Sequence, residues 1–145
     1  MVEIYTDASV SFKHGIATAT CFAISPQSFI GYQVFSYDDC NNTALAEIMG
    51  AADGLEYTST VTDLENKKVV LFSDFPALFS ISKKDLNTTT TMDDRTKSQV
   101  ARLQKLIKRY NVRIEYIAGH QKKMNPNKVV DFISNSTLRY KIRGV

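Results

Sequence analysis

Cysteine is scarce in this 145-residue chain, which contains only Cys21 and Cys40. Two cysteines without metal-ligand spacing provide neither a disulfide framework nor a zinc site. Cys21 lies in a strand-like stretch, so we expect it to act as a small buried hydrophobic residue. These features exclude a disulfide-stapled secreted domain and predict a cytoplasmic, or at least intracellular, protein that is not secreted.

Long apolar runs are also absent. No stretch approaches the roughly 20 residues needed to cross a bilayer, and the N-terminus shows no secretory pattern, so we expect no membrane association. The composition, with 43% hydrophobic and 23% charged residues, is typical of a globular protein. Internal repeats and linker-like segments are missing as well. We therefore expect residues 1–145 to form a single domain.

The formal net charge of +3 is modest, but its distribution is uneven. The last third of the chain is rich in basic side chains, which fits a polyanionic partner. A solvated helix face and tail would explain this charge equally well. The basic residues of this region are Lys105, Lys108, Arg109, Arg113, Lys122, Lys123, Lys128, Arg139, Lys141 and Arg143.

The periodicity of apolar residues predicts the order of the elements. Three strands joined by short turns begin the chain and predict an antiparallel meander. A helix then begins near Thr43, the expected N-cap, and a short, almost wholly apolar strand later in the chain is of the parallel type. The expected strands cover residues 2–10, 16–24, 28–37, 68–73 and 112–117, and the expected helices cover about 43–57, 76–82, 95–110 and 125–141, with a loop at 83–94. This order predicts an α/β fold with a mixed five-stranded sheet, three antiparallel strands followed by parallel βα units, flanked by helices.

Four acidic residues lie at informative places in this pattern: Asp7, Glu47, Asp74 and Asp131. Two end or follow apolar strands, and two lie within helices. A carboxylate in such a place is costly unless a partner offsets its desolvation and the repulsion of its neighbours. Mg²⁺ is the hard cation that oxygen ligands of this kind hold. Each residue alone has an ordinary explanation as a cap, a first-turn charge or a surface residue, but the four together predict a metal site.

The helix that carries Glu47 also has small residues at positions 46, 50 and 54. Glycine in a helix costs about 1 kcal/mol relative to alanine. Gly50 and Gly54 therefore indicate that the helix backbone approaches a neighbouring element closely.

Five segments, in this order, resemble the type 1 ribonuclease H family over almost the whole chain. They are Tyr5-Thr6-Asp7-Ala8-Ser9, Ala46-Glu47, Phe72-Ser73-Asp74, Gly119-His120 and the stretch from Asn127 to Asp131. The resemblance implies a ribonuclease H-like fold and hydrolysis of the RNA strand of RNA–DNA hybrids by a metal-dependent endonuclease, which leaves 5′-phosphate and 3′-hydroxyl ends.

The resemblance also implies roles for individual residues. The four carboxylates would bind two Mg²⁺ ions, with Mn²⁺ as a substitute and no small-molecule cofactor. Two such ions about 4 Å apart activate a water and stabilise the leaving oxygen. His120 would assist by proton transfer or product release. The residues expected to bind substrate are Ser9, Asn42, Thr43, Lys122 and Lys123.

The chain departs from the family pattern in ways that concern substrate affinity. Ala8 replaces a glycine, Phe75 replaces a small polar residue, and Thr43 and Ala44 stand where asparagines are common. The segment 81–97 is too short and acidic for a basic substrate handle, and the chain has no tryptophan.

Two alternatives remain open from the sequence. One is a nuclease or strand-transferase of the same fold that acts on DNA, and the other is a non-catalytic nucleic-acid-binding domain from a reverse transcriptase. We expect a monomer or one domain of a larger polyprotein.

Overall fold

The computed structural model describes residues 1–83, 92–117, 138 and 142. The helix expected at residues 125–141, and most of the loop expected at 83–94, therefore lie outside the described residues.

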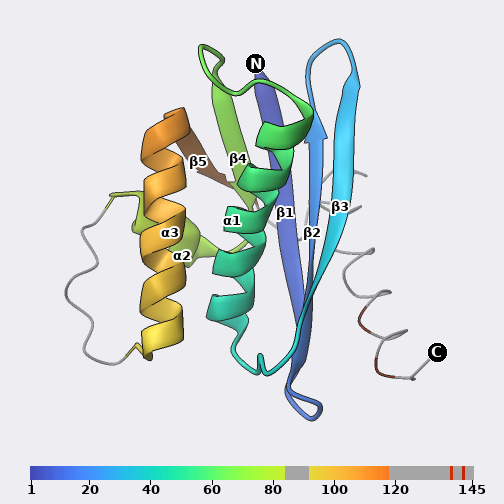
Figure 1. The fold of residues 1–145 in the computed structure, drawn as a ribbon, viewed down its shortest axis with the longest axis vertical. Helices are drawn as coiled ribbons and strands as arrows, with labels where there is room; N and C mark the ends of the chain where they lie inside the picture. Colours follow the sequence, from blue (N-terminus) through green and yellow to red (C-terminus); the bar gives the residue numbers. More distant parts are fainter. Residues whose placement is uncertain (84–91, 118–137, 139–141, 143–145) are drawn as a thin grey trace.

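A mixed five-stranded sheet forms the centre of the fold (Figure 1). Its strands are β1 (Val2–Ser11), β2 (Ile16–Ile24), β3 (Phe29–Tyr37), β4 (Val69–Ser73) and β5 (Val112–Tyr116). They are arranged in the order β3-β2-β1-β4-β5. The β1–β2 and β2–β3 pairs are antiparallel, whereas β1–β4 and β4–β5 are parallel. The sheet predicted from the apolar periodicity is confirmed.

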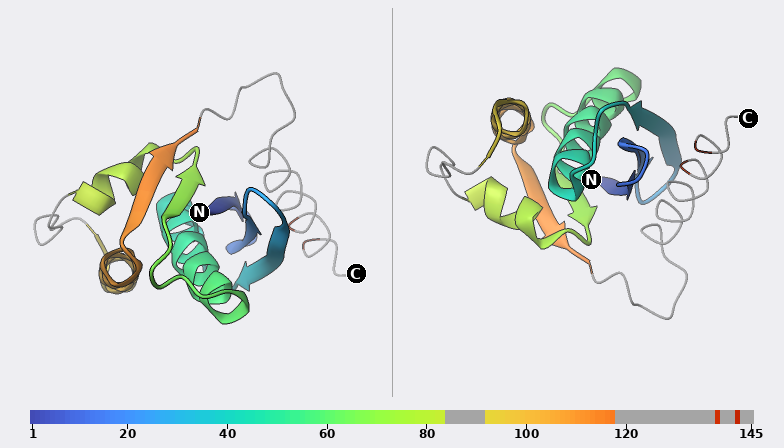
Figure 2. Two further views of the ribbon diagram at one scale, coloured as in Figure 1. Left: turned by 90° about the horizontal axis from the view of Figure 1, so that it is seen from above. Right: turned by 90° about the horizontal axis from the view of Figure 1, so that it is seen from below.

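Three helices are described: α1 (Thr43–Val61), α2 (Pro76–Lys83) and α3 (Asp94–Tyr110). The two longer helices, α1 and α3, pack side by side, and α1 lies across β1, β2 and β3 (Figures 1 and 2). Within the described residues, no helix is long and apolar enough to cross a membrane.

The start of α1 differs from the prediction. Asn42, not Thr43, is the N-cap, and its side-chain oxygen accepts a hydrogen bond from the backbone N–H of Leu45 at 3.1 Å. Thr43 already belongs to the first turn. Both residue types cap helices, so only the backbone conformation, extended at Asn42, decides which of them does so.

The end of α1 also differs, because the helix continues to Val61 rather than ending near Tyr57. Its last turn contains three hydroxyl residues, which the periodicity does not favour. Each of their hydroxyls donates to a backbone oxygen of the preceding turn: Thr58 to Gly54, Ser59 to Glu56, and Thr60 to Tyr57. This bonding satisfies the hydroxyls within the helix and lets the polar run remain helical.

The two glycines of α1 do face the sheet closely, as predicted. A Cβ atom at Gly50 would lie 2.7 Å from the Cβ of Ala19, and one at Gly54 would lie 3.1 Å from Thr6 Cγ2. Cys21 is fully buried against the same helix, and burial raises the pKa of its thiol to about 12. The prediction that Cys21 is a small buried residue is confirmed.

An ion-pair cluster joins α1, α3 and β3 at one side of the helix layer. The guanidinium of Arg102 donates to Asp53 at 2.6 Å and contacts Glu56 at 2.9 Å. The hydroxyl of Tyr37 on β3 donates to the other oxygen of Asp53. This cluster fixes the position of α1 against both of its neighbours.

Candidate metal centre

The parallel pairing of β1 with β4 brings two of the predicted carboxylates together. Tyr5 lies opposite Phe72 in the ladder, and their rings stack with centroids 4.8 Å apart, so both side chains lie on the same face of the sheet. Side chains alternate along a strand, so Asp7, two residues after Tyr5, lies on that face as well. Asp74 follows Phe72 by two residues, immediately after β4 ends. The register therefore places both aspartates beyond the aromatic pair.

Glu47 reaches the same place from α1. It lies in the second turn of the helix and is only 5% exposed, so it is not the solvated first-turn charge of the ordinary explanation. The close approach of Gly50 to Ala19 holds this part of α1 against the sheet. The helix therefore delivers Glu47 to the edge of β1 where Asp7 lies.

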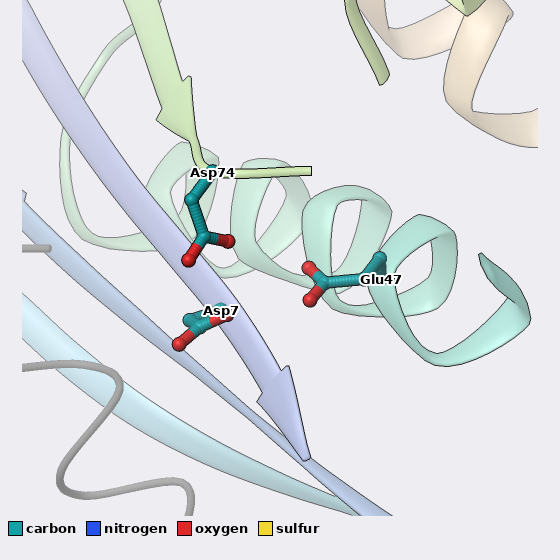
Figure 3. Close-up of side chains that lie close together, drawn as sticks. All are labelled: Asp7, Glu47 and Asp74. Atoms are coloured by element: carbon teal, nitrogen blue, oxygen red, sulfur yellow. The ribbon is translucent and has the colours of Figure 1, made fainter. Parts of the chain in front are cut away.

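The three carboxylates converge. One ligand oxygen from each of Asp7, Glu47 and Asp74 lies within 4.8 Å of the others. Figure 3 shows the three side chains pointing toward one another from β1, from α1 and from the segment that follows β4. Asp7 is 4% exposed, and Asp74 is half-buried.

This donor set fits a hard divalent cation. All three donors are carboxylate oxygens, the ligand type that Mg²⁺ prefers. Three like charges at this separation, two of them removed from water, repel one another, and a bound cation relieves that repulsion. The described residues therefore bring together three oxygen donors that could hold a divalent cation.

The aromatic pair below the carboxylates has its own electrostatic environment. Burial, together with the neighbouring carboxylate of Glu3, raises the pKa of Tyr5 to about 12. The hydroxyl of Tyr5 donates to Glu3 at 3.3 Å. Tyr5 therefore stays neutral at physiological pH and adds no negative charge beside Asp7.

The expected substrate-binding residues at this end of the sheet occupy two places. Ser9 lies on β1, two residues beyond Asp7 on the same face, and is half-buried. Asn42 and Thr43 are exposed at the start of α1. The oxygen of the Asn42 amide is engaged in the helix cap, which was not foreseen.

Four predicted site residues lie outside the described residues: His120, Lys122, Lys123 and Asp131. Their predicted roles remain predictions.

Two features of the site were missed from the sequence. Thr20 lies opposite Asp7 in the β1–β2 ladder and is fully buried, but a threonine in an alternating strand carries no distinguishing signal. The stacking of Tyr5 on Phe72 was missed because it depends on strand register. The alternation of β1 alone would have placed Tyr5 on the face of Asp7.

Comparison with known proteins agrees with this geometry. Residues 1–139 match the family model described as RNase H. No curated protein sequence matches the chain.

Several solved structures share its fold. The N-terminal RNase H domain of Rv2228c from Mycobacterium tuberculosis, solved as a fusion with maltose-binding protein, has a TM-score of 0.77 at 13% identity, covering 99% of this chain and 96% of that one. RNase H1 from the halophilic archaeon Halobacterium salinarum NRC-1 has a TM-score of 0.72 at 16% identity, with coverages of 95% and 97%. LC11-RNase H1, solved in complex with an RNA/DNA hybrid, has a TM-score of 0.75 at 14% identity, with coverages of 94% and 95%.

At these identities the solved structures establish the fold, and the match to the family model over residues 1–139 establishes family membership. The chain therefore belongs to the RNase H family and is a ribonuclease H hydrolase.

Proposed function

We propose that this protein is a metal-dependent endonuclease that hydrolyses the RNA strand of RNA–DNA hybrids and leaves 5′-phosphate and 3′-hydroxyl ends. The observation that carries the proposal is the convergence of Asp7, Glu47 and Asp74 within 4.8 Å in a chain of the RNase H family. We further propose that residues 1–145 act as one domain.

The carboxylates would hold the metal. Asp7, Glu47 and Asp74 supply three ligands, and Asp131 is the proposed fourth. Divalent cations, proposed to be two Mg²⁺ ions with Mn²⁺ as a substitute, would supply an activated water and stabilise the leaving oxygen. The protein's own contribution is to fix the carboxylates on rigid elements, since β1 and α1 are both buried around the site. His120 would transfer a proton or assist product release.

Selection of RNA requires contact with the 2′-hydroxyl, which distinguishes RNA from DNA. Ser9 on β1 and the exposed Asn42 and Thr43 at the start of α1 flank the carboxylates and offer hydroxyl and amide groups to the substrate. The solved complex of LC11-RNase H1 with an RNA/DNA hybrid supports a hybrid as the partner. Lys122 and Lys123 are the proposed phosphate contacts.

Cleavage of matched substrates tests the proposal directly. Purified protein is incubated with end-labelled RNA–DNA hybrid, duplex RNA and duplex DNA of one sequence, with Mg²⁺, Mn²⁺ or EDTA. We expect cleavage of the hybrid alone, only with metal, and products that a ligase accepts as 5′-phosphate and 3′-hydroxyl ends. Preferential cleavage of duplex DNA would assign the protein to the DNA-directed alternative. No cleavage of any substrate would favour the non-catalytic binding domain.

A further inference from the structure

A second concave surface lies at the opposite end of the sheet from the carboxylates. It is a groove of about 890 Å³ formed where the α1–β4 connection meets the turn between α3 and β5. Figure 1 shows that these two connections lie at the same end of the molecule, beside the N-terminus. Lys68 precedes Asp74 by six residues, about 20 Å along an extended strand. The groove is therefore separate from the candidate metal centre.

The groove is strongly basic. Lys67, Lys68, Arg109 and Arg113 line it, and Glu65 is its one acidic residue. Its lining residues therefore carry an excess of three positive charges.

Neighbouring carboxylates offset these cations only in part. Arg109 lies 4.0 Å from Glu65, with both side chains about two-thirds exposed, and an exposed pair at this distance is weak. Arg113 pairs with Glu115 at 2.8 Å, but its side chain is still 58% exposed. Within the described part of the chain, Lys67 and Lys68 form no ion pair.

Structural requirements account for only part of this charge. A cation at the end of α3 interacts favourably with the helix dipole, which explains Arg109. Lys67 and Lys68 lie in the connection before β4, and Arg113 lies on β5, so the dipole does not explain them. The positive potential they create is available to a ligand.

Other groups in the groove indicate the class of ligand. Asn66 and Asn111, both exposed with left-handed backbone conformations, present amide donors. The half-buried ring of Tyr110 lies beneath the guanidinium of Arg109, 5.1 Å from its centroid. Cations, amide donors and an aromatic ring are the groups that bind single-stranded nucleic acid. None of the strongly exposed large apolar side chains of the described residues lines the groove, which argues against a membrane surface.

We propose that this groove, formed by Lys67, Lys68, Arg109 and Arg113 with Asn66, Asn111 and Tyr110, is a second nucleic-acid site that binds the phosphate backbone of a single strand. The site goes beyond the proposed cleavage function and does not rest on it. It supplies a basic contact in a chain whose segment 81–97 is, by its sequence, too short and acidic for a basic substrate handle.

The test uses a probe that ribonuclease H chemistry cannot cleave. Binding of a fluorescein-labelled oligothymidylate is measured by anisotropy in EDTA across a salt titration. Two double variants carry the same charge change. K67A/K68A alters the groove, and K97A/K105A alters two exposed lysines of α3 outside it.

We expect K67A/K68A to weaken binding about tenfold or more at 0.1 M salt and to reduce the salt slope by about 0.7 for each lost phosphate contact. K97A/K105A should bind like the parent. Equal loss in both variants, or no binding by the parent, would overturn the inference. So would groove-dependent binding of phosphatidylserine vesicles or polyglutamate in place of the oligonucleotide.

The outcome is independent of catalysis. If the parent binds the oligonucleotide in the groove but cleaves no hybrid, the proposed function fails and the groove site stands. If hybrid is cleaved but K67A/K68A binds the oligonucleotide like the parent, the groove site fails and the proposed function stands.

Discussion

At the scale of single residues, the candidate site depends on three carboxylates that would repel one another without a cation. Asp7 and Glu47 are almost fully buried, and their oxygens lie within 4.8 Å of that of Asp74. Such like-charge repulsion disfavours the folded state unless a cation offsets it, which is consistent with the proposed metal binding. The carboxylates whose repulsion lowers the stability of the folded protein are therefore the same groups that the proposed chemistry requires.

Replacement of either aspartate by asparagine separates these two effects. Asp7→Asn and Asp74→Asn should each abolish hybrid cleavage and leave thermal stability in EDTA equal or higher, because one repulsive charge is removed with little change in volume. The measurements are initial cleavage rates at saturating Mg²⁺ and thermal unfolding. Asp53→Asn is the matched control, since it weakens the pair with Arg102 away from the site and should lower stability but retain cleavage. Near-normal turnover in either site variant would contradict the metal-ligand assignment.

The raised pKa of Tyr5 predicts that the protein loses stability at alkaline pH. Its pKa is raised to about 12 in the folded protein, above the ordinary value of 10.0. The stability that neutral Tyr5 contributes is therefore complete below pH 10 and is lost as the pH rises through 12. Tyr5→Phe should reduce the difference in free energy of unfolding between pH 9 and pH 11, measured by urea denaturation. An unchanged difference would mean that Tyr5 ionises normally in the folded state.

At the scale of elements, α1 connects the fold to the site, because one helix carries the cap, the two glycines and Glu47. Any change that shifts its start or its distance from the sheet moves the Glu47 carboxylate. Its N-cap and its contact with β2 can be tested separately.

The cap at Asn42 can be separated from substrate contact by two substitutions. Asn42→Ala should destabilise the protein by about 1 kcal/mol, because the backbone N–H of Leu45 loses its partner. Asn42→Ser preserves a neutral cap and should remain within about 0.5 kcal/mol of the parent. Thermal unfolding measures both. If Asn42→Ser nevertheless binds hybrid more weakly, the amide group itself contacts the substrate. Equal stability of all three proteins would show that the cap contributes nothing.

Gly50 tests the contact between helix and sheet. A Cβ at this position would lie 2.7 Å from that of Ala19, between two backbones that cannot move apart easily. We expect Gly50→Ala to destabilise the protein by about 1–3 kcal/mol in spite of the better helix propensity of alanine. Gly31→Ala is the control, since its Cβ would meet the hydroxyl end of the Tyr57 side chain, which can rotate away. A stabilising Gly50→Ala would show that the sheet yields at this contact.

At the scale of the whole molecule, the described residues place an acidic cluster and a basic groove at opposite ends of the sheet. The carboxylates gather beyond the end of β4, and the basic groove lies at the start of β4 and β5. Between them the Arg102 cluster and the apolar core, with Ile4, Leu55 and Leu71 fully buried, hold the layers together.

Binding of a metal ion at the three carboxylates should stabilise the whole domain against unfolding. A ligand that binds only the folded state raises the free energy of unfolding by about 2.7 kcal/mol at a concentration of 100 Kd. We expect Mg²⁺ to raise the Tm in a single unfolding transition, compared with NaCl at equal ionic strength. Asp7→Asn should show a smaller shift. An equal shift in both proteins would place the bound Mg²⁺ elsewhere.

The sequence by itself determined the order and type of the described elements, because apolar periodicity and turn residues are local signals. It also identified Asp7, Glu47 and Asp74 as a group, through their positions on those elements and through the resemblance to ribonuclease H. The sequence did not predict the boundaries of α1 correctly. Asn42 and Thr43 are both good caps, and the hydroxyls of the last turn form hydrogen bonds within the helix.

Only the tertiary structure determined which residues lie close together. The register of β1 on β4 aligns Asp7 with Asp74, and the close packing of Gly50 on Ala19 positions the helix that buries Glu47 beside them. The groove was equally invisible in the sequence, since Lys67 and Arg109 are 42 positions apart and meet only because β4 and β5 run parallel. Local pattern specifies elements, whereas sites arise from packing and register, which join residues distant in the chain.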